Sequence, residues 1–355
     1  MIPPRRQMKI KNNRGSIAIF IGLTLTMLVG ITALTVDIGY GLIVRTELQN
    51  VADAAVLAGT RQLGLIYEGL APNEQKPTWV IPDADQTTIV NQVQAVALLN
   101  KAGTKPITIN ASDIQIGLWD YATKTFTVTT TGPIAVRAVA RRDGNANGPI
   151  PTFLAGILGW NTINVSATAT ASLGGMGSSL PGEIEVPFGV AEYWFSQKSC
   201  GESIRFHPTG DLDGCAGWHT LDLSPPNAHT LAVDVIDEMT AGNFESEATV
   251  AGYTQYEYIG GNVASAFDNF ITLYDSKKDW ETGEWPVTVP VYESTDCSNP
   301  NDAITIVGYA KAVITNVIPP PDMQIDAYMD CGYVEGGRSG GTNFGIMGSI
   351  PGLVQ

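Results

Sequence analysis

The sequence is short of basic residues and of histidine, and both shortages exclude classes of protein. Its 355 residues hold 20 Lys and Arg against 35 Asp and Glu, for a net charge of −15. Such an acidic chain repels phosphate backbones, which argues against nucleic-acid binding. The three histidines, His207, His219 and His229, form no H-E-x-x-H motif or other metal-ligand spacing. We expect each of them to lie in the core or on the surface.

Catalytic motifs are also lacking. Residues 337–341 match the G-x-S-x-G pattern of hydrolases, but no Asp, Glu or His follows Ser339, as that mechanism requires. The segment Gly175-Met176-Gly177 lacks the third glycine of a dinucleotide-binding turn. We interpret the first match as a glycine-rich loop, and we expect a protein that is not an enzyme and has no cofactor.

The N-terminal part combines a basic head with a long uncharged run. The first fourteen residues carry five basic side chains and no acid, and residues 17–36 carry no charge. At ~1.5 Å per residue, this run can cross a hydrocarbon layer of ~30 Å. The basic residues before the run place the N-terminus in the cytoplasm. The alternative is a cleaved signal peptide, but the run is long for one and no A-x-A-like site follows.

Two helical stripes are predicted on either side of the membrane boundary. Small residues recur every four positions on one face that a neighbouring helix could approach: Ala18, Gly22, Thr26 and Gly30. The alternative is that glycine and threonine are simply tolerated in lipid. After the run, apolar residues form a heptad-like seam: Val44, Leu48, Val51, Ala55 and Ala58. We expect this seam to pack on the protein's own sheet rather than in a free coiled coil.

Asp37 stands directly after the uncharged run. We interpret it as the point where the helix leaves the lipid, because a carboxylate is tolerable at the membrane interface and costly at the midplane. The alternative is that Asp37 pairs with an amine of a partner protein. One continuous helix from about Ile17 to Leu63 is expected, with Gly39 and Gly41 as places where it could bend.

Several motifs around this run resemble a known family. They are Arg14-Gly15 before the run, Val36-Asp37-Ile38-Gly39 at its end, and then Arg45, Leu48-Gln49 and Ala52-Asp53-Ala54-Ala55. Together they resemble the N-terminal segment of the TadE/TadG-like proteins of Flp (Tad) pilus assembly. Residues 117–126, 135–142 and 151–171 look like the longer, TadG-like members. The resemblance implies a single-pass envelope protein associated with assembly of a surface pilus.

Two features of related proteins are missing. Pilin-type precursors are cut after a glycine and usually carry a glutamate at the fifth mature position, but cleavage after Gly15 would place Phe20 there. Some TadG-like relatives contain a von Willebrand-type A domain with a D-x-S-x-S metal motif, which this sequence lacks. The resemblance therefore supports neither pilin-like polymerisation nor adhesion through such a domain.

The pattern as a whole predicts an α+β fold in six segments. They are a basic cytoplasmic segment (1–14), a transmembrane helix (15–36), its extramembrane continuation (37–64), an α+β domain packed on that helix (65–173), a Gly/Ser linker (174–182) and a β-rich domain (183–355). Apolar and polar residues alternate in 165–172, which predicts a strand with one buried face of small side chains. That face suits packing against the alanine side of the long helix.

All four cysteines, Cys200, Cys215, Cys297 and Cys331, lie in the last segment, outside the membrane. An even number in an oxidising compartment favours two disulfides, with three connectivities possible. Proximity in the sequence favours Cys200–Cys215 and Cys297–Cys331. A zinc site is the alternative, but the chain has no C-x-x-C pair.

A calcium loop is a further hypothesis. In "GDLDG", residues 210–214, Asp211 and Asp213 are spaced as in calcium-binding loops and are followed by a turn-making glycine. The position of the bidentate glutamate of an EF-hand is occupied by Asp222, which is shorter. The alternative is a solvated β-turn.

We therefore expect a non-enzymatic, single-pass protein of the bacterial inner membrane that supports assembly or anchoring of Flp/Tad-type pili. Its bulk would lie in the periplasm or at the cell surface. Its partners would be the membrane and other pilus-assembly or pilin helices, with a homo-oligomer possible. The first alternative is a filament subunit or minor pilin whose apolar helix forms the fibre core. The second is a surface adhesin or ligand-binding module, suggested by Trp194, Trp218, Trp280 and Trp285.

Overall fold

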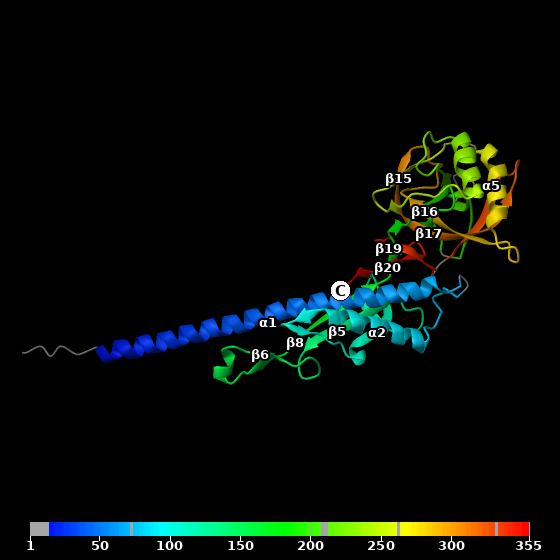
Figure 1. Ribbon diagram of the computed structural model, residues 1–355. Coiled ribbons are helices and arrows are strands. Elements are labelled where there is room, and N and C mark those ends of the chain that lie inside the picture. Colours follow the sequence, from blue (N-terminus) through cyan, green and yellow to red (C-terminus); the bar gives the residue numbers. More distant parts are fainter. Residues whose placement is uncertain are drawn as a thin grey trace, which may run out of the picture.

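The computed structural model describes residues 14–71, 74–199, 201–206, 212–260, 263–330 and 333–354. One helix, α1 (Arg14–Glu68), is 55 residues long and projects from a body that gathers around its C-terminal end (Figure 1). The helix runs through Gly39 and Gly41 without a break. The expected long helix and α+β class are confirmed, since antiparallel sheets and a few shorter helices follow α1.

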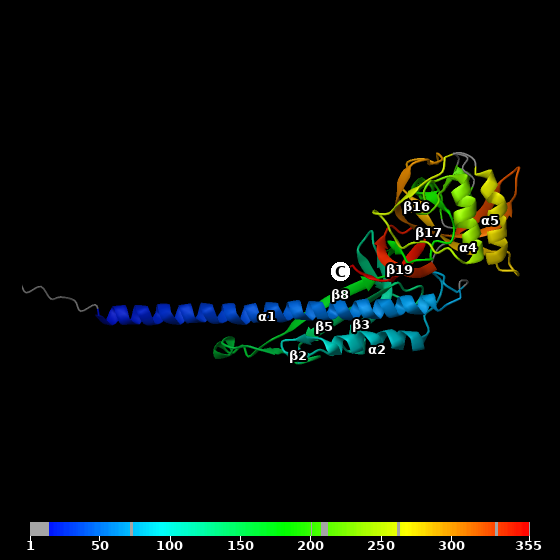
Figure 2. The same cartoon turned by 45° about the horizontal axis from the view of Figure 1, so that its top comes forward.

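The C-terminal half of α1 packs on a five-stranded antiparallel sheet. In spatial order the strands are β21 (Gly352–Leu353), β8 (Val165–Ser172), β5 (Ala135–Arg142), β3 (Ile114–Asp120) and β4 (Thr125–Val128). The second helix, α2 (Asp83–Leu99), lies beside α1 on this sheet (Figure 2). Asp83 and Asp85 lie in its first turn, where carboxylates suit the helix dipole.

Close packing between α1 and its neighbours depends on two glycines. A Cβ at Gly59 would lie 2.4 Å from Cγ2 of Val93 in α2, and a Cβ at Gly64 would lie 2.3 Å from the carbonyl oxygen of Ser349. Both distances are too short for a side chain. The glycines therefore allow α1 to approach α2 on one side and the C-terminal strands on the other.

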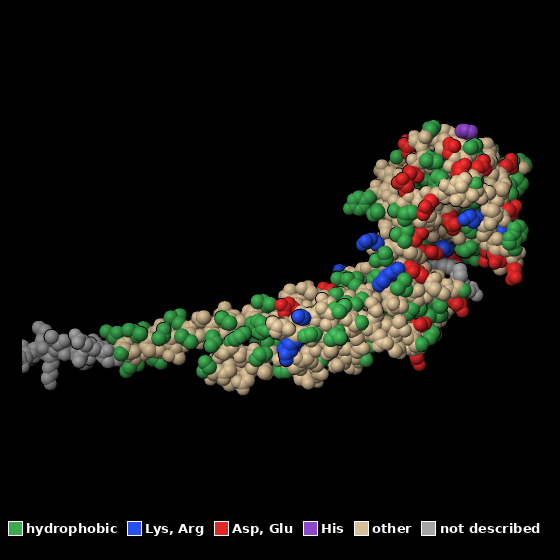
Figure 3. Space-filling view, in the orientation of Figure 1, with side chains coloured by type: hydrophobic (Ala, Val, Ile, Leu, Met, Phe, Trp, Pro, Cys, Tyr) green, Lys and Arg blue, Asp and Glu red, His purple; other side chains and the backbone are tan. Residues whose placement is uncertain are grey.

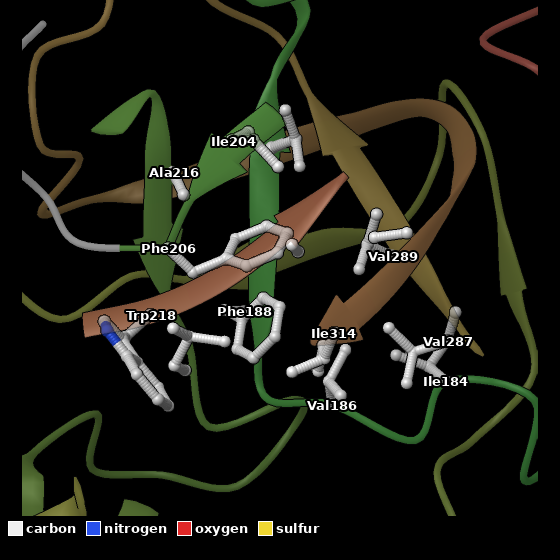
Figure 4. Packing of buried hydrophobic residues seen from close by; sticks show 14 of the residues in the cluster. Ile184, Val186, Phe188, Ile204, Phe206, Ala216, Trp218, Val287, Val289 and Ile314 are labelled. Atoms are coloured by element: carbon white, nitrogen blue, oxygen red, sulfur yellow. The ribbon is translucent and has the colours of Figure 1, made fainter. Parts of the chain in front are cut away.

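A second body is built on a mixed, mainly antiparallel sheet. Its strands, in spatial order, are β12 (Ser203–Arg205), β18 (Gln324–Asp330), β17 (Ala303–Ile318), β16 (Trp285–Tyr292), β11 (Phe188–Ala191) and β13 (Ala216–Trp218), with β15 (Gln255–Glu257) paired to β17. The helices are α3 (Glu192–Gln197), η4 (Thr230–Asp237), α4 (Glu238–Ala241) and α5 (Ala264–Lys277). In its core Phe188 packs on Phe206 and Trp218 (Figure 4). It also contacts the ring of Phe270.

The segment expected to link two domains is part of a small sheet instead of a free chain. Within residues 174–182, β9 (Gly175–Met176) pairs with β19 (Tyr333–Gly341) and β20 (Ile346–Ile350), and β10 (Ser178–Ser179) pairs with β14 (Thr249–Val250). The last strand, β21, returns to the sheet under α1. The two bodies are therefore joined by hydrogen-bonded strands as well as by the chain segment that runs from one body to the other.

The interpretation of residues 337–341 as a loop is wrong, because they belong to β19. The Ser339 hydroxyl donates to the carbonyl oxygen of Gly348 at 2.9 Å and accepts from the Gly174 N–H at 2.9 Å. A Cβ at Gly341 would lie 2.3 Å from the carbonyl oxygen of Met176. Glycine is needed here for close approach of strands, and the serine holds them together.

The expected cysteine pairing is also wrong. Cys215 is bonded to Cys297, with an S–S distance of 1.96 Å and a sequence separation of 82 residues. Strand β13 follows Cys215 and pairs with β11, which in turn pairs with β16, the strand before Cys297. Sheet topology thus overrides proximity in sequence. Cys200 and Cys331 lie outside the described residues.

An arm extends from the first body along α1, away from the second body (Figures 1 and 2). It consists of β6 (Ile150–Pro151), the short 3-10 helix η2 (Ala155–Leu158) and β7 (Thr162–Ile163). Strands β6 and β7 pair in antiparallel fashion. The remaining short elements are β1 (Lys101–Ala102), β2 (Lys105–Pro106), η1 (Ala111–Asp113) and η3 (Leu212–Gly214).

Candidate functional site

The N-terminal half of α1 is apolar and uncovered. From Ile17 to Thr32 its large hydrophobic side chains are all more than half exposed, and Figure 3 shows hydrophobic side chains along this projecting part. Among the described residues, α1 is the one helix long and apolar enough to cross a membrane. A core helix of a soluble protein would be buried, which this segment is not. The uncovered half of α1 fits a membrane anchor.

The stripe of small residues has no neighbour within the described chain. Ala18, Gly22 and Thr26 are exposed and Gly30 is half-buried, and apart from the helix's own backbone no atom lies within 4 Å of a Cβ built at either glycine. The Thr26 hydroxyl donates to the carbonyl oxygen of Gly22 at 2.8 Å, so it is satisfied inside its own helix. The face is free for another helix or for lipid.

The seam residues contact the sheet. Four of the five are buried, namely Val44, Leu48, Val51 and Ala55, and Ala58 is half-buried. They share one core with β3, β5 and β8. Burial of a Val or Leu side chain contributes ~1.5–3 kcal/mol, so this seam fastens the C-terminal half of α1 to the first body.

Asp37 lies where the uncovered half of α1 meets the arm. It is 2% exposed, although its helical neighbours Val36 and Ile38 are exposed. Its carboxylate accepts three backbone hydrogen bonds from the start of η2: Oδ1 from Phe153 at 2.6 Å, and Oδ2 from Leu154 at 3.0 Å and from Ala155 at 2.6 Å. Two acceptor atoms thus satisfy three donors that a helix start leaves unpaired.

These hydrogen bonds also set the charge state of Asp37. Burial alone would raise its pKa, but the N–H groups of Phe153, Ala155 and Leu154 outweigh that effect and lower the pKa below 3.8. The side chain is therefore a carboxylate at neutral pH. The sequence identified Asp37 by its place after the apolar run, but no sequence pattern connected it to residues 153–155.

The tip of the arm presents large apolar side chains to the outside. Phe153 is 65% exposed, Ile157 82% and Trp160 65%. The ring of Phe153 also contacts the edge of Tyr40 on α1, with 5.4 Å between centroids. Gly159 ends η2 in the left-handed region, with φ 91°, which turns the chain back into β7.

The four tryptophans considered as ligand contacts divide into two groups. Trp194, Trp218 and Trp285 are buried in the core of the second body, where they cannot contact an external ligand. Trp280 is 79% exposed. A cavity of about 530 Å³ lies between the two bodies, with Tyr67, Lys76, Phe195 and Lys198 among its lining residues.

The histidines and the calcium candidates provide no assembled site in the described chain. His219 is buried, its pKa is lowered by burial to about 3, and its Nδ1 accepts from the Leu221 N–H at 3.1 Å. His229 is exposed and His207 lies outside the described residues. Asp213 is in η3 and Asp211 lies outside the described residues, so the calcium hypothesis remains a prediction. No group of three or more described His, Cys, Asp or Glu side chains is placed to hold a metal ion.

Comparison with known proteins identifies two family models along the chain. The Tad model, described as Flp pilus-assembly TadE/G-like, matches residues 15–62, and the Tad_C model, described as Tad-like Flp pilus-assembly, matches residues 78–171. No curated protein and no solved structure matches the chain. The first match contains Asp37 and the seam, and the second contains α2, the arm and the strands of the sheet other than β21, up to residue 171. Residues 15–62 and 78–171 are therefore similar to the TadE/TadG-like family of Flp pilus-assembly proteins.

Proposed function

We propose that this protein is a non-enzymatic, single-pass anchor of the bacterial inner membrane that supports assembly or anchoring of Flp/Tad-type pili. The observation that carries this proposal is the length of the uncovered part of α1. The uncharged residues 17–36 of α1 rise about 30 Å at ~1.5 Å per residue, and among them only Ala33 is buried. That length matches a hydrocarbon core of ~30 Å.

The proposed orientation places the N-terminus in the cytoplasm and both bodies on the outer side. Five basic residues precede the apolar run, and the acidic side chains gather mainly on the second body (Figure 3). The Cys215–Cys297 disulfide supports the same orientation, because disulfides persist in the oxidising periplasm and are rare in the cytoplasm.

Such an anchor would couple the membrane to the exported part rigidly. The same helix that crosses the lipid continues into the core of the first body, where Leu48 and Val51 are fully buried. A displacement of α1 in the membrane would therefore move that body with it. The free face of Ala18, Gly22, Thr26 and Gly30 supports contact with other assembly or pilin helices, since small residues let helix backbones approach closely.

A filament subunit or minor pilin is the second candidate. The observation that favours it is again the uncovered apolar half of α1. Attached to the folded bodies, this half could equally pack with copies of itself in a fibre. In that case α1 would be withdrawn from lipid on assembly. The two functions differ in where the mature protein resides.

Cell fractionation combined with N-terminal sequencing tests the proposal. The anchor function predicts that the protein stays in the inner membrane after surface filaments are sheared off, with an N-terminus upstream of Gly15. Recovery in the sheared filaments, with a new N-terminus at Ser16, would favour the filament subunit. Recovery in the soluble periplasm would contradict both functions.

A further inference from the structure

The arm is unusually free of charge for this acidic protein. No Asp, Glu, Lys, Arg or His occurs from residue 144 to residue 182, although the chain carries a net charge of −15. Within this stretch the arm tip, residues 153–160, exposes Phe153, Ile157 and Trp160 together. A cluster of large exposed apolar side chains is unfavourable in water and indicates a surface that is normally covered.

The position of the tip along α1 indicates what covers it. Of the described residues 17–43, only Ala33 and Asp37 are buried, and η2 contacts α1. The tip therefore reaches the level at which α1 becomes uncovered, as Figures 1 and 2 show. If the bare part of α1 spans the hydrocarbon, the tip meets the outer surface of the same bilayer.

The backbone of the tip is prepared for an environment poor in water. Asp37 accepts from three of its N–H groups. Others are paired within the arm: Ile157 donates to Leu154, Gly159 to Gly156 and Trp160 to Ala155, each at 3.1 Å. Non-helical backbone near hydrocarbon must have its polar groups satisfied internally. The buried carboxylate thus supplies acceptors that water would provide elsewhere.

The geometry points to a second, shallow membrane contact: the arm tip, residues 153–160, inserts into the outer interfacial layer of the bilayer beside the transmembrane part of α1. The inference rests on the proposed membrane anchor. Trp is enriched at the level of the lipid headgroups, and apolar side chains of interfacial segments enter by ~5–10 Å. A single helix could rotate and tilt in the membrane, whereas the added contact fixes the orientation of the exported bodies.

Lipid is favoured over a protein partner because the tip continues a surface that already faces lipid. It offers no charged side chain that would select a partner, and it lies against Tyr40 and Asp37 on the anchor itself. Only general apolar contact is available at Phe153, Ile157 and Trp160. That is the contact a bilayer provides.

Tryptophan quenching in lipid vesicles tests the inference. The full-length protein is reconstituted in phosphatidylethanolamine and phosphatidylglycerol vesicles in which part of the lipid carries brominated acyl chains. Wild type should show a bromine-dependent loss of fluorescence that Trp160→Phe abolishes. The matched control is Trp280→Phe, since Trp280 is also exposed, at 79%, but lies on the second body, and this variant should retain the loss. Bromines near the headgroup should quench more than bromines near the chain end.

A second variant keeps the test independent of the tryptophan itself. Ile157→Asp should reduce the quenching of Trp160, because a carboxylate draws the tip toward water, whereas Tyr253→Asp, on an exposed loop of the second body, should not. Equal quenching in wild type, Trp160→Phe and Ile157→Asp would overturn the inserted tip while leaving the anchor intact. Failure of the wild type to float with the vesicles would overturn the anchor and the tip together.

Comparison of quenching in vesicles with acrylamide quenching in native membranes shows whether lipid or protein covers the arm tip. If Trp160 is unquenched in vesicles but is shielded from acrylamide in native membranes, the tip contacts a protein and the insertion into lipid is wrong. If it is quenched in vesicles that contain no other protein, lipid alone suffices.

Discussion

Asp37 and Ala155 are 118 residues apart in sequence, yet Oδ2 of the first accepts a hydrogen bond from the backbone N–H of the second at 2.6 Å. This contact joins the end of the proposed transmembrane segment to the tip of the arm. It explains how one carboxylate can be buried at a membrane boundary. The charge is surrounded by N–H donors, and the donors at the start of η2 find acceptors.

Replacement of Asp37 should release the arm without unfolding either body. In Asp37→Ala the three N–H groups lose their acceptor, so the amides of Leu154 and Ala155 should exchange with deuterium much faster than in wild type. Asp37→Asn, which keeps one carbonyl acceptor, should show an intermediate effect. Unchanged protection of residues 153–155 in Asp37→Ala would show that the carboxylate does not hold the arm.

The same contact predicts a response to acid. The pKa of Asp37 is lowered from 3.8 in the folded protein. The ionised carboxylate therefore contributes stability that is present above pH 3.8 and is lost as the pH falls through the lower, folded pKa. Amide protection of the tip should therefore be constant between pH 7 and pH 5. It should fall only in stronger acid, and a loss already near pH 6 would contradict this assignment.

Glu183 should respond to pH in the opposite sense. Burial raises its pKa from 4.5 to about 7, with smaller contributions from Glu335 and Glu68, against the lowering effect of the Leu180 N–H. Because its pKa is raised in the folded protein, ionisation of Glu183 lowers the free energy of unfolding. This destabilisation is absent below pH 4.5 and complete above about pH 7. Because the side chain is partly exposed, Glu183→Gln should stabilise the protein by only about 1–2 kcal/mol at pH 8.

Urea unfolding of wild type and Glu183→Gln at pH 4 and pH 8 checks this prediction. The two proteins should be nearly equally stable at pH 4 and differ at pH 8. A variant that is less stable than wild type at pH 8 would show that the ionised carboxylate is favourable where it lies.

The seam should be far more sensitive to truncation than the outer face of the same helix. Leu48 is fully buried, so Leu48→Ala should destabilise the first body by about 2–5 kcal/mol. The matched control is Leu42→Ala, since Leu42 is 57% exposed and should change the free energy of unfolding by less than about 0.5 kcal/mol. Equal effects, measured by denaturation in detergent, would mean that α1 is not fastened through this seam.

Two glycines of α1 offer a matched test of close packing. Gly64→Ala places a Cβ against the carbonyl oxygen of Ser349, which is backbone and cannot move cheaply, and should cost about 1–3 kcal/mol. Gly39→Ala meets nothing within 4 Å and should stabilise the helix by about 0.5–1 kcal/mol. Thermal unfolding of both variants gives the comparison, and a stabilising Gly64→Ala would contradict the contact between α1 and Ser349.

Peptide mapping without reduction should find Cys215 linked to Cys297. The long loop that this bond closes implies a contribution of about 4 kcal/mol by the chain-entropy estimate, so the double replacement by serine should lower stability by up to that amount. The Gly201 N–H donates to the carbonyl oxygen of Met329 at 2.6 Å, and on this ground we expect a Cys200–Cys331 peptide as the second product. A Cys200–Cys215 peptide would contradict the structure.

Local patterns in the sequence were sufficient for the elements that depend on neighbours in the chain. The uncharged run, the seam from Val44 to Ala55 and the alternation in residues 165–172 each predict an element that the structure contains, because helix and strand periodicity is encoded residue by residue.

Contacts between distant segments could not be predicted in this way. The partner of Asp37 depends on an arm that is folded back from another part of the sheet, and the partner of Cys215 depends on the order of β13, β11 and β16. Residues 174–182 look loose because of their glycines, yet those glycines serve close strand approach. In each case the contact depends on the order of strands in the folded chain, and local sequence patterns do not encode that order.

Protease accessibility on both sides of the inner membrane tests the central claim most directly. In spheroplasts, added protease should reach the two bodies and leave a protected fragment that contains residues 17–36. In inverted inner-membrane vesicles the bodies should be protected. The reverse pattern, or complete digestion of the N-terminal helix in sealed spheroplasts, would contradict an anchor that crosses the bilayer and holds its bodies outside the cytoplasm.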